Sequence, residues 1–194
     1  MGRGSGSATA DVNKPIFIGG GGEGYLVVGQ DLTDAVEPYI SLRKGGGNFY
    51  THWDDSKVAD ALRAVHAAGR PIILIGHSWG GSDAIAAARW ARGNEITVDL
   101  LITIDPVGQP NYLIWSTGTY RGIASHWVTV IAGKPGMQAG DPVAHAWGKT
   151  PTVIQNFANR IIRDASAGHA DFATMMKTAG AEALIANVYG AKRR

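Results

Sequence analysis

The chain has 194 residues, of which 45% are hydrophobic, and its formal net charge is +2. This length and apolar content fit one domain with a sizeable core, whereas the small, scattered charge excludes a surface that follows nucleic-acid phosphates. The absence of cysteine excludes disulfides, thiolate zinc sites and a cysteine nucleophile, and it leaves the compartment open.

Residues 1–12 read MGRGSGSATADV and differ in composition from the rest of the chain. They have neither the apolar core nor the cleavage pattern of a signal peptide. We interpret them as a disordered leader or an expression remnant, followed by one domain over residues 13–194. No apolar run approaches the length of a membrane-spanning helix, so we expect no transmembrane segment. Oligomeric state and localisation, whether cytoplasmic or exported by a signal-less route, stay undefined.

Short apolar runs alternate with segments of helical period after that leader, which is typical of an α/β domain with a mainly parallel sheet. Strands are expected at residues 15–18, 48–51, 71–76, 98–104 and 126–132, with a sixth between Thr152 and Arg163. Helices are expected at residues 32–43, 56–68, 82–91 and 171–189, with Gly180 as a weak point in the last. The glycine- and proline-rich stretches 107–119 and 133–151 are expected to form loops that cover a site.

The first expected strand leads into a run of four glycines within KPIFIGGGGEGY. Glycine has no Cβ, so this backbone can approach a ligand closely. Gly19, Gly21 and Gly24 fit the dinucleotide fingerprint G-x-G-x-x-G, but the loop could instead offer N–H groups to an oxyanion. The fingerprint also requires an acidic residue about 20 positions further on, and the acidic residues after the next strand come too late. The sequence therefore favours the oxyanion interpretation and no nucleotide cofactor.

The peptide PIILIGHSWGGSDAIAAARW contains a G-x-S-x-G element, from Gly76 to Gly80, between an apolar strand and an alanine-rich helix. A nucleophile elbow requires this setting, because its serine occupies a sharp, strained turn between strand and helix. Small residues two positions on either side let the two elements approach without a Cβ clash. Ser78 is therefore the candidate nucleophile, and the competing interpretation is an inert serine in a tight turn.

With this element the chain resembles the α/β-hydrolase superfamily, and GHSWGG is similar to the elbow of a lipase or esterase. The resemblance implies a single-domain α/β-hydrolase fold with about six mainly parallel strands, helices on both faces and no large cap domain. It also implies two oxyanion donors, one from the loop after the first strand and one from the residue after the nucleophile. These positions are Gly21, with Gly20 and Gly22 as close alternatives, and Trp79.

In that family the acid and the base follow the serine in chain order, each at the end of a strand. Asp105 follows the apolar strand in VDLLITIDPVG, and Asp141, after the next strand, is its rival because most members carry the acid there. His169, between the last strand and the terminal helix, matches the catalytic histidine, and His145 and His126 are weaker candidates. Of the other histidines, His77 is assigned to packing, His52 to a strand end and His66 to a helix.

The expected reaction is hydrolysis of a carboxylic ester through an acyl-enzyme, which needs no cofactor. Tyr112, Trp115 and Trp147 lie in the expected covering loops, so a small-molecule ester or lipid-like substrate with an apolar group is expected. The spacing of Asp164, His169 and Asp171 is generic, so no metal site is expected. A thioesterase, amidase or acyltransferase would use the same residues, and a non-catalytic binding protein could keep the fold. These alternatives stay open.

Overall fold

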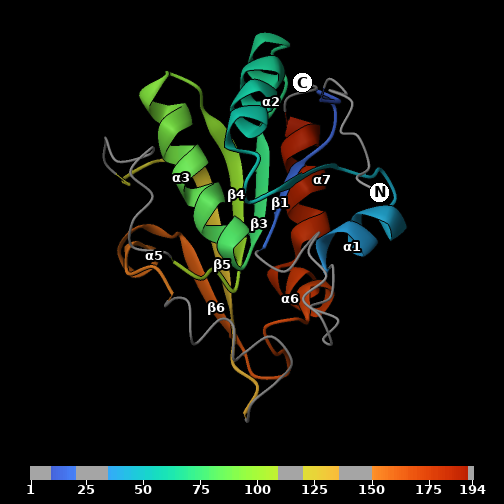
Figure 1. Ribbon diagram of the computed structural model, residues 1–194, viewed down its shortest axis with the longest axis vertical. Helices are drawn as coiled ribbons and strands as arrows, with labels where there is room; N and C mark the ends of the chain where they lie inside the picture. The colour runs from blue at the N-terminus through green and yellow to red at the C-terminus, as the bar shows by residue number, and fades with distance from the viewer. Residues whose placement is uncertain (1–9, 21–34, 109–119, 136–149, 192–194) are drawn as a thin grey trace.

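The computed structural model describes residues 10–20, 35–108, 120–135 and 150–191, and its strands form one parallel sheet (Figure 1). The strand order is β2-β1-β3-β4-β5-β6, and every neighbouring pair is parallel. The strands are β1 (Ile16–Gly19), β2 (Asn48–Thr51), β3 (Ile73–His77), β4 (Val98–Ile104), β5 (Ala124–Ala132) and β6 (Arg160–Asp164). Each lies within or overlaps a stretch that the sequence predicts as a strand.

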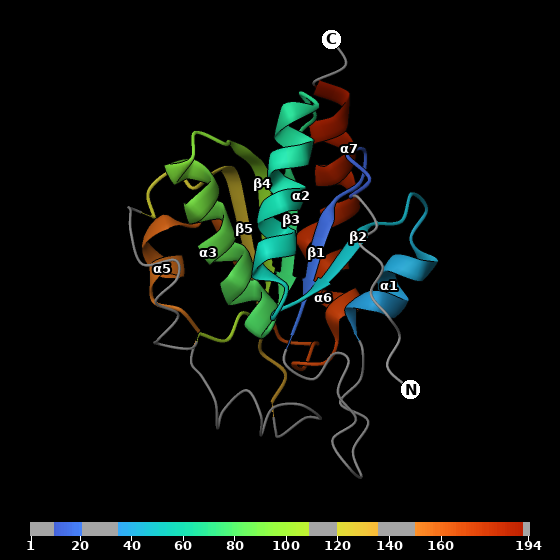
Figure 2. The same ribbon diagram turned by 45° about the horizontal axis from the view of Figure 1, so that its top comes forward.

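Helices cover both faces of this sheet (Figure 2). The helices are α1 (Val36–Leu42), α2 (Asp55–Ala67), α3 (Trp79–Gly93), α5 (Val153–Phe157), α6 (Phe172–Ala179) and α7 (Ala181–Ala191). Side chains of α2, α3 and α5 pack on the face that carries Ile16 and Ile18, and those of α1, α6 and α7 pack on the face that carries Phe17. Successive strand residues point to opposite faces, so a strand covered by helices on both faces needs apolar residues at nearly every position. This explains the continuous apolar runs in the sequence.

One predicted helix and the stretch of the sixth predicted strand differ from the structure. The helix expected over residues 171–189 is divided into α6 and α7 by Gly180, whose φ is +68°. Glycine adopts this left-handed conformation without a Cβ penalty, so it ends α6 and lets the chain start α7 at a new angle. In the stretch expected to hold the sixth strand, the short helix α5 comes first and β6 begins only at Arg160.

The predicted architecture is confirmed: the described residues form an α/β fold with a parallel six-stranded sheet and helices on both faces. The described ranges form no separate cap domain. No helix within them combines the length and the apolar character that crossing a membrane requires. The boundary between a leader of residues 1–12 and the domain stays a prediction.

All strands run in the same direction, so their carboxyl ends meet at one edge of the sheet. The residues that directly follow β1, β3, β4 and β6 therefore lie at the same edge of the sheet. Ligand sites of parallel sheets lie outside the carboxyl ends of the strands. The candidate residues Gly20, Ser78, Asp105 and His169 belong to the segments that follow β1, β3, β4 and β6.

Candidate active site

Ser78 occupies a strained turn between β3 and α3. Its φ of 55° and ψ of −125° are unusual for a residue with a side chain. The turn is held from both sides: the Ser78 N–H donates to Ile104 O at 3.0 Å, and Ser78 O accepts from Gly81 N at 2.9 Å and Val107 N at 3.0 Å. Such strain persists only where the surrounding bonds impose it, and it is common at functional sites.

The glycines around Ser78 allow this turn because a larger residue would not fit. A Cβ on Gly76 would lie 2.1 Å from the carbonyl oxygen of Gly80, and one on Gly80 would lie 2.3 Å from that of Ile18. Real Cβ atoms do not approach backbone so closely. The small residues that the sequence places two positions before and after Ser78 are therefore required by close packing of β1, β3 and α3.

His169 joins Ser78 to Asp105. Its Nε2 lies 2.9 Å from Ser78 Oγ, and its Nδ1 lies 2.7 Å from Asp105 Oδ2. A proton on Nδ1 donates to the carboxylate, which leaves Nε2 to accept from the serine hydroxyl. The loops after β3, β4 and β6 thus bring together three residues that the sequence singles out. We call these residues the elbow cluster: Ser78, Asp105 and His169.

Asp105 is held in place by its backbone as well as by His169. Its φ is +38°, its N–H donates to Val130 O at 2.7 Å, and its Oδ1 accepts from Ala132 N at 3.0 Å. Burial acts to raise the pKa of Asp105. The hydrogen bond from His169, the charge of His169 and the hydrogen bond from the Ala132 N–H outweigh burial and bring the pKa below its usual range. The carboxylate therefore stays ionised beside the imidazole.

The sequence pattern assigns His77 only to packing, but in the structure His77 also contacts the segment that carries His169. Its Nε2 lies 2.8 Å from the carbonyl oxygen of His169, and the two rings lie 5.1 Å apart. The ring of Phe172, at the start of α6, packs edge-on against His77 at 5.4 Å. The one hint of the contact between His77 and His169 in the sequence is that His77 directly precedes Ser78.

The loop after β1 approaches the nucleophile closely. A Cβ on Gly20 would lie 2.7 Å from Ser78 Cβ and 3.2 Å from Ser78 Oγ. Trp79 is the first residue of α3, and N–H groups in a first helical turn have no intrahelical partner. His52, directly after β2, is buried, and its ring lies 5.2 Å from that of Trp79. Burial lowers the pKa of His52, although a backbone hydrogen bond with Gly20 and the charge of Asp54 act to raise it.

Several predicted positions lie outside the described residues. They are the oxyanion donor Gly21, the rival acid Asp141, the alternative base His145 and the substrate contacts Tyr112, Trp115 and Trp147. The other weak histidine, His126, lies on β5. In the described ranges no cluster of three or more metal-ligating side chains is found. Asp164 instead accepts hydrogen bonds from Ser166 at 2.6 Å and Thr178 at 2.5 Å.

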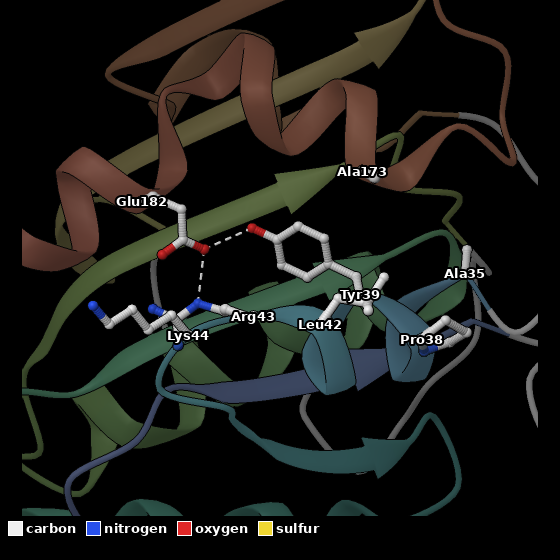
Figure 3. Close-up of a pocket in the computed structure, with 8 residues that line it drawn as sticks. All are labelled: Ala35, Pro38, Tyr39, Leu42, Arg43, Lys44, Ala173 and Glu182. Carbon is white, nitrogen blue, oxygen red and sulfur yellow. Dashed lines mark hydrogen bonds and ion pairs between the residues drawn. The ribbon is translucent and has the colours of Figure 1, made fainter.

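A groove of about 440 Å³ lies between α1 and the helices α6 and α7 (Figure 3). Within it, Glu182 Oε1 accepts hydrogen bonds from the Tyr39 hydroxyl and from Arg43 Nε, each at 2.7 Å. We call these three residues the groove cluster. The Tyr39 ring packs edge-on against Phe172 at 5.3 Å, so Phe172 contacts both this groove residue and His77. Nothing in the sequence pattern indicated the groove.

Comparison with known proteins places this architecture among hydrolases. A model of the alpha/beta hydrolase family matches residues 17–189. The thioesterase domain SrfTE, which cyclises the lipopeptide antibiotic surfactin, is a solved structure of similar fold, with a TM-score of 0.52, 16% identity, and coverage of 90% of this chain and 92% of that one.

Two further similar structures are Est1E from Butyrivibrio proteoclasticus and the mature lipase BlEst2 from Bacillus licheniformis. Est1E has a TM-score of 0.46 and 15% identity over 87% of this chain and 85% of its own. BlEst2 has a TM-score of 0.45 and 13% identity over 92% of this chain and 94% of its own. The comparison with curated proteins finds no match. At these identities the likeness concerns the fold.

Proposed function

Because this chain belongs to the alpha/beta hydrolase family, we propose that it is a serine hydrolase that cleaves carboxylic esters with Ser78, His169 and Asp105. One observation carries the proposal: an unbroken line of hydrogen bonds runs from the Ser78 hydroxyl through the His169 ring to the Asp105 carboxylate. The strained conformation of Ser78 supports it, since strain of this kind collects at reactive residues.

In the first half-reaction Ser78 Oγ attacks the ester carbonyl carbon while its proton moves to His169 Nε2. A hydroxyl is a poor nucleophile until it loses this proton, and the 2.9 Å contact allows the transfer. The resulting imidazolium is stabilised by Asp105, whose lowered pKa keeps it negatively charged. When the tetrahedral intermediate collapses, the ester C–O bond breaks and the alcohol leaves with the proton from His169.

The negative charge on the carbonyl oxygen needs hydrogen-bond donors beside Ser78. We assign this role to the N–H of Trp79, at the positive end of the α3 dipole, and to the predicted donor Gly21. The close approach of Gly20 to Ser78 supports the assignment, because it brings the start of the glycine loop to the nucleophile. Loss of one such donor reduces kcat by about 10²–10³ in comparable sites.

In the second half-reaction His169 removes a proton from a water molecule, which attacks the acyl carbon of the acyl-enzyme. The acyl–Oγ bond then breaks, and Ser78 recovers its proton from His169. The products are a carboxylic acid and an alcohol, and the elbow cluster returns to its starting state. In this chemistry Ser78 and His169 carry out every proton transfer, and Asp105 stays ionised throughout.

A fluorophosphonate probe tests the proposal directly, because it phosphonylates only an activated serine. We expect the wild-type protein to be labelled at Ser78, Ser78→Ala to remain unlabelled, and His169→Ala to react about 10³-fold more slowly or not at all. Ser41→Ala is the matched control, since this exposed serine on α1 should not affect labelling. A folded wild-type protein that resists the probe would instead favour the non-catalytic binding protein.

Substrate class can be resolved with p-nitrophenyl esters of increasing chain length, assayed alongside acyl thioesters and amides. Thioester and amide hydrolysis would use the same residues, so the ratios of kcat/KM separate the classes. We expect hydrolysis of the oxygen esters, and an apolar acyl pocket should make kcat/KM rise with chain length. Preference for thioesters by more than tenfold would replace the ester assignment with a thioesterase.

A further inference from the structure

The proposed reaction gives no part to a second histidine beside the elbow cluster. His77 is the last residue of β3 and directly precedes Ser78. Its Nε2 lies 2.8 Å from the carbonyl oxygen of His169, a residue 92 positions away in the sequence. A carbonyl oxygen can only accept, so His77 Nε2 carries a proton and donates it. This bond connects the segment of the proposed nucleophile to the segment of the proposed base.

His77 is itself fixed, which suits it to hold another group. It is 5% exposed, and its backbone is paired with Ile104 in the neighbouring strand β4. One side of its ring is covered by Phe172 at 5.4 Å, and the ring of His169 lies 5.1 Å away. A side chain so enclosed loses little further rotamer entropy when it forms a hydrogen bond. The bond therefore holds the His169 backbone against a rigid strand.

The loop that carries His169 has other anchors, which come from Asp171 and from the end of β5. Gly168 N donates to Asp171 Oδ2 at 2.8 Å, and Asp171 N donates to Gly168 O at 3.0 Å. Ala167 O accepts from Gly133 N at 3.2 Å, which attaches the loop to the end of β5. These bonds set the shape of the loop and its place on the sheet. The His77 bond joins the loop to β3, the strand that leads into the elbow.

We propose that His77 is a positioning residue, which holds the main chain of His169 so that its ring reaches both Ser78 and Asp105. This inference rests on the proposed function. The ring must satisfy two short contacts at once, 2.9 Å to Ser78 and 2.7 Å to Asp105, so it tolerates little movement of its backbone. A displacement of about 1 Å in a catalytic group can cost about 10²-fold in rate.

The test replaces the donor while it keeps the volume of the ring. His77→Phe should lower kcat for p-nitrophenyl acetate by about 10- to 100-fold with little change in KM, because it misplaces the base without touching a substrate contact. Fluorophosphonate labelling of Ser78 should slow by the same factor. His77→Gln should recover most of both rates, since its amide N–H can occupy the place of Nε2. His66→Phe, at an exposed position of α2, is the control and should leave both rates unchanged.

The outcomes separate this inference from the proposed function. If wild-type protein is not labelled at Ser78, the proposed function is wrong and the inference fails with it. If wild-type protein is labelled and His77→Phe reacts at the same rate, His77 has no positioning role and the hydrolase assignment stands. Equal losses in His77→Phe and His77→Gln would also contradict positioning through the N–H donor.

A further pair of variants covers the case in which His77→Phe does not fold. His77→Asn carries the same amide as His77→Gln on a side chain one methylene shorter, so its N–H cannot reach the His169 carbonyl in the same way. The inference then predicts that His77→Gln is at least tenfold faster than His77→Asn at equal thermal stability. Equal rates for these two variants would overturn it.

Discussion

Phe172 contacts Tyr39 of the groove cluster and His77, the neighbour of Ser78 in the elbow cluster. Both clusters consist of three polar side chains joined by short hydrogen bonds. The bonds measure 2.9 and 2.7 Å in the elbow cluster, and both measure 2.7 Å in the groove cluster. Bond lengths alone do not distinguish a site of chemistry from a structural contact between helices.

The two clusters differ chiefly in backbone conformation. Ser78 and Asp105 both have positive φ, at 55° and 38°, whereas Tyr39 and Glu182 lie in the regular helices α1 and α7. Burial separates them less sharply: the side chain of His169 is 9% exposed, whereas in the groove cluster that of Arg43 is 8% exposed and that of Glu182 is 54% exposed. Backbone strain therefore marks the elbow cluster, because it persists only with support from the rest of the fold.

The largest effect should come from removing the charge of the elbow cluster. Asp105→Asn keeps the shape of the side chain but can no longer select the His169 tautomer or stabilise the imidazolium, so kcat for ester hydrolysis should fall about 10⁴-fold. Steady-state hydrolysis of p-nitrophenyl acetate measures the loss, and circular dichroism checks the fold. Asp141→Asn is the matched control and should retain activity. The reverse pattern would make Asp141 the acid.

Asp83 shows how burial changes the pKa of a carboxyl group when no hydrogen bond from a histidine opposes it, in contrast to Asp105. Asp83, in α3, is 7% exposed, and burial together with the charge of Asp55 raises its pKa to about 8. The unfolded value is near 3.8, so between about pH 4 and 8 the folded state binds more protons than the unfolded state. The free energy of unfolding should therefore fall as pH rises through this window.

Asp83→Asn should remove this pH dependence, because the amide does not ionise. We compare the free energy of unfolding of the variant with that of wild type at each pH. This difference should favour the variant more at pH 8.5 than at pH 4.5, by on the order of a few kcal/mol. Urea denaturation at both values measures the difference. Asp60→Asn, at an exposed site on α2, should show no such gain. Parallel pH profiles for wild type and Asp83→Asn would show that Asp83 ionises without cost to the fold.

The sequence was most informative where local rules decide the structure. Periodicity and turn residues predict the strands, and the strand–turn–helix context of Ser78 predicts a bend that requires glycine at positions 76 and 80. The assignment of His169, after the last strand, was instead implied by the resemblance to the α/β-hydrolase superfamily, and the parallel sheet explains its position because the carboxyl ends of the strands meet at one edge. The strands and the bend at Ser78 need only neighbours in the chain, whereas the role of His169 needs the resemblance.

Contacts between distant segments could not be predicted in this way. The bond from His77 to the carbonyl of His169 depends on the path of one loop, and nothing in the residues beside His77 encodes that path. The groove cluster likewise depends on how α1 packs against α7, since Tyr39 and Glu182 are 143 positions apart. The short helix α5 was missed because five residues carry too little periodic signal to compete with a strand assignment.

The smallest effect should come from the groove cluster. Glu182→Gln removes the charge but keeps an amide oxygen that can accept from Tyr39 or Arg43, and the half-exposed side chain is screened by solvent. The free energy of unfolding should fall by less than about 1 kcal/mol, and kcat for p-nitrophenyl acetate should stay at the wild-type value. Urea denaturation and the ester assay measure both. A tenfold loss of kcat at unchanged stability would mean that the groove acts on the reaction through Phe172, and the distinction between the two clusters would then be wrong.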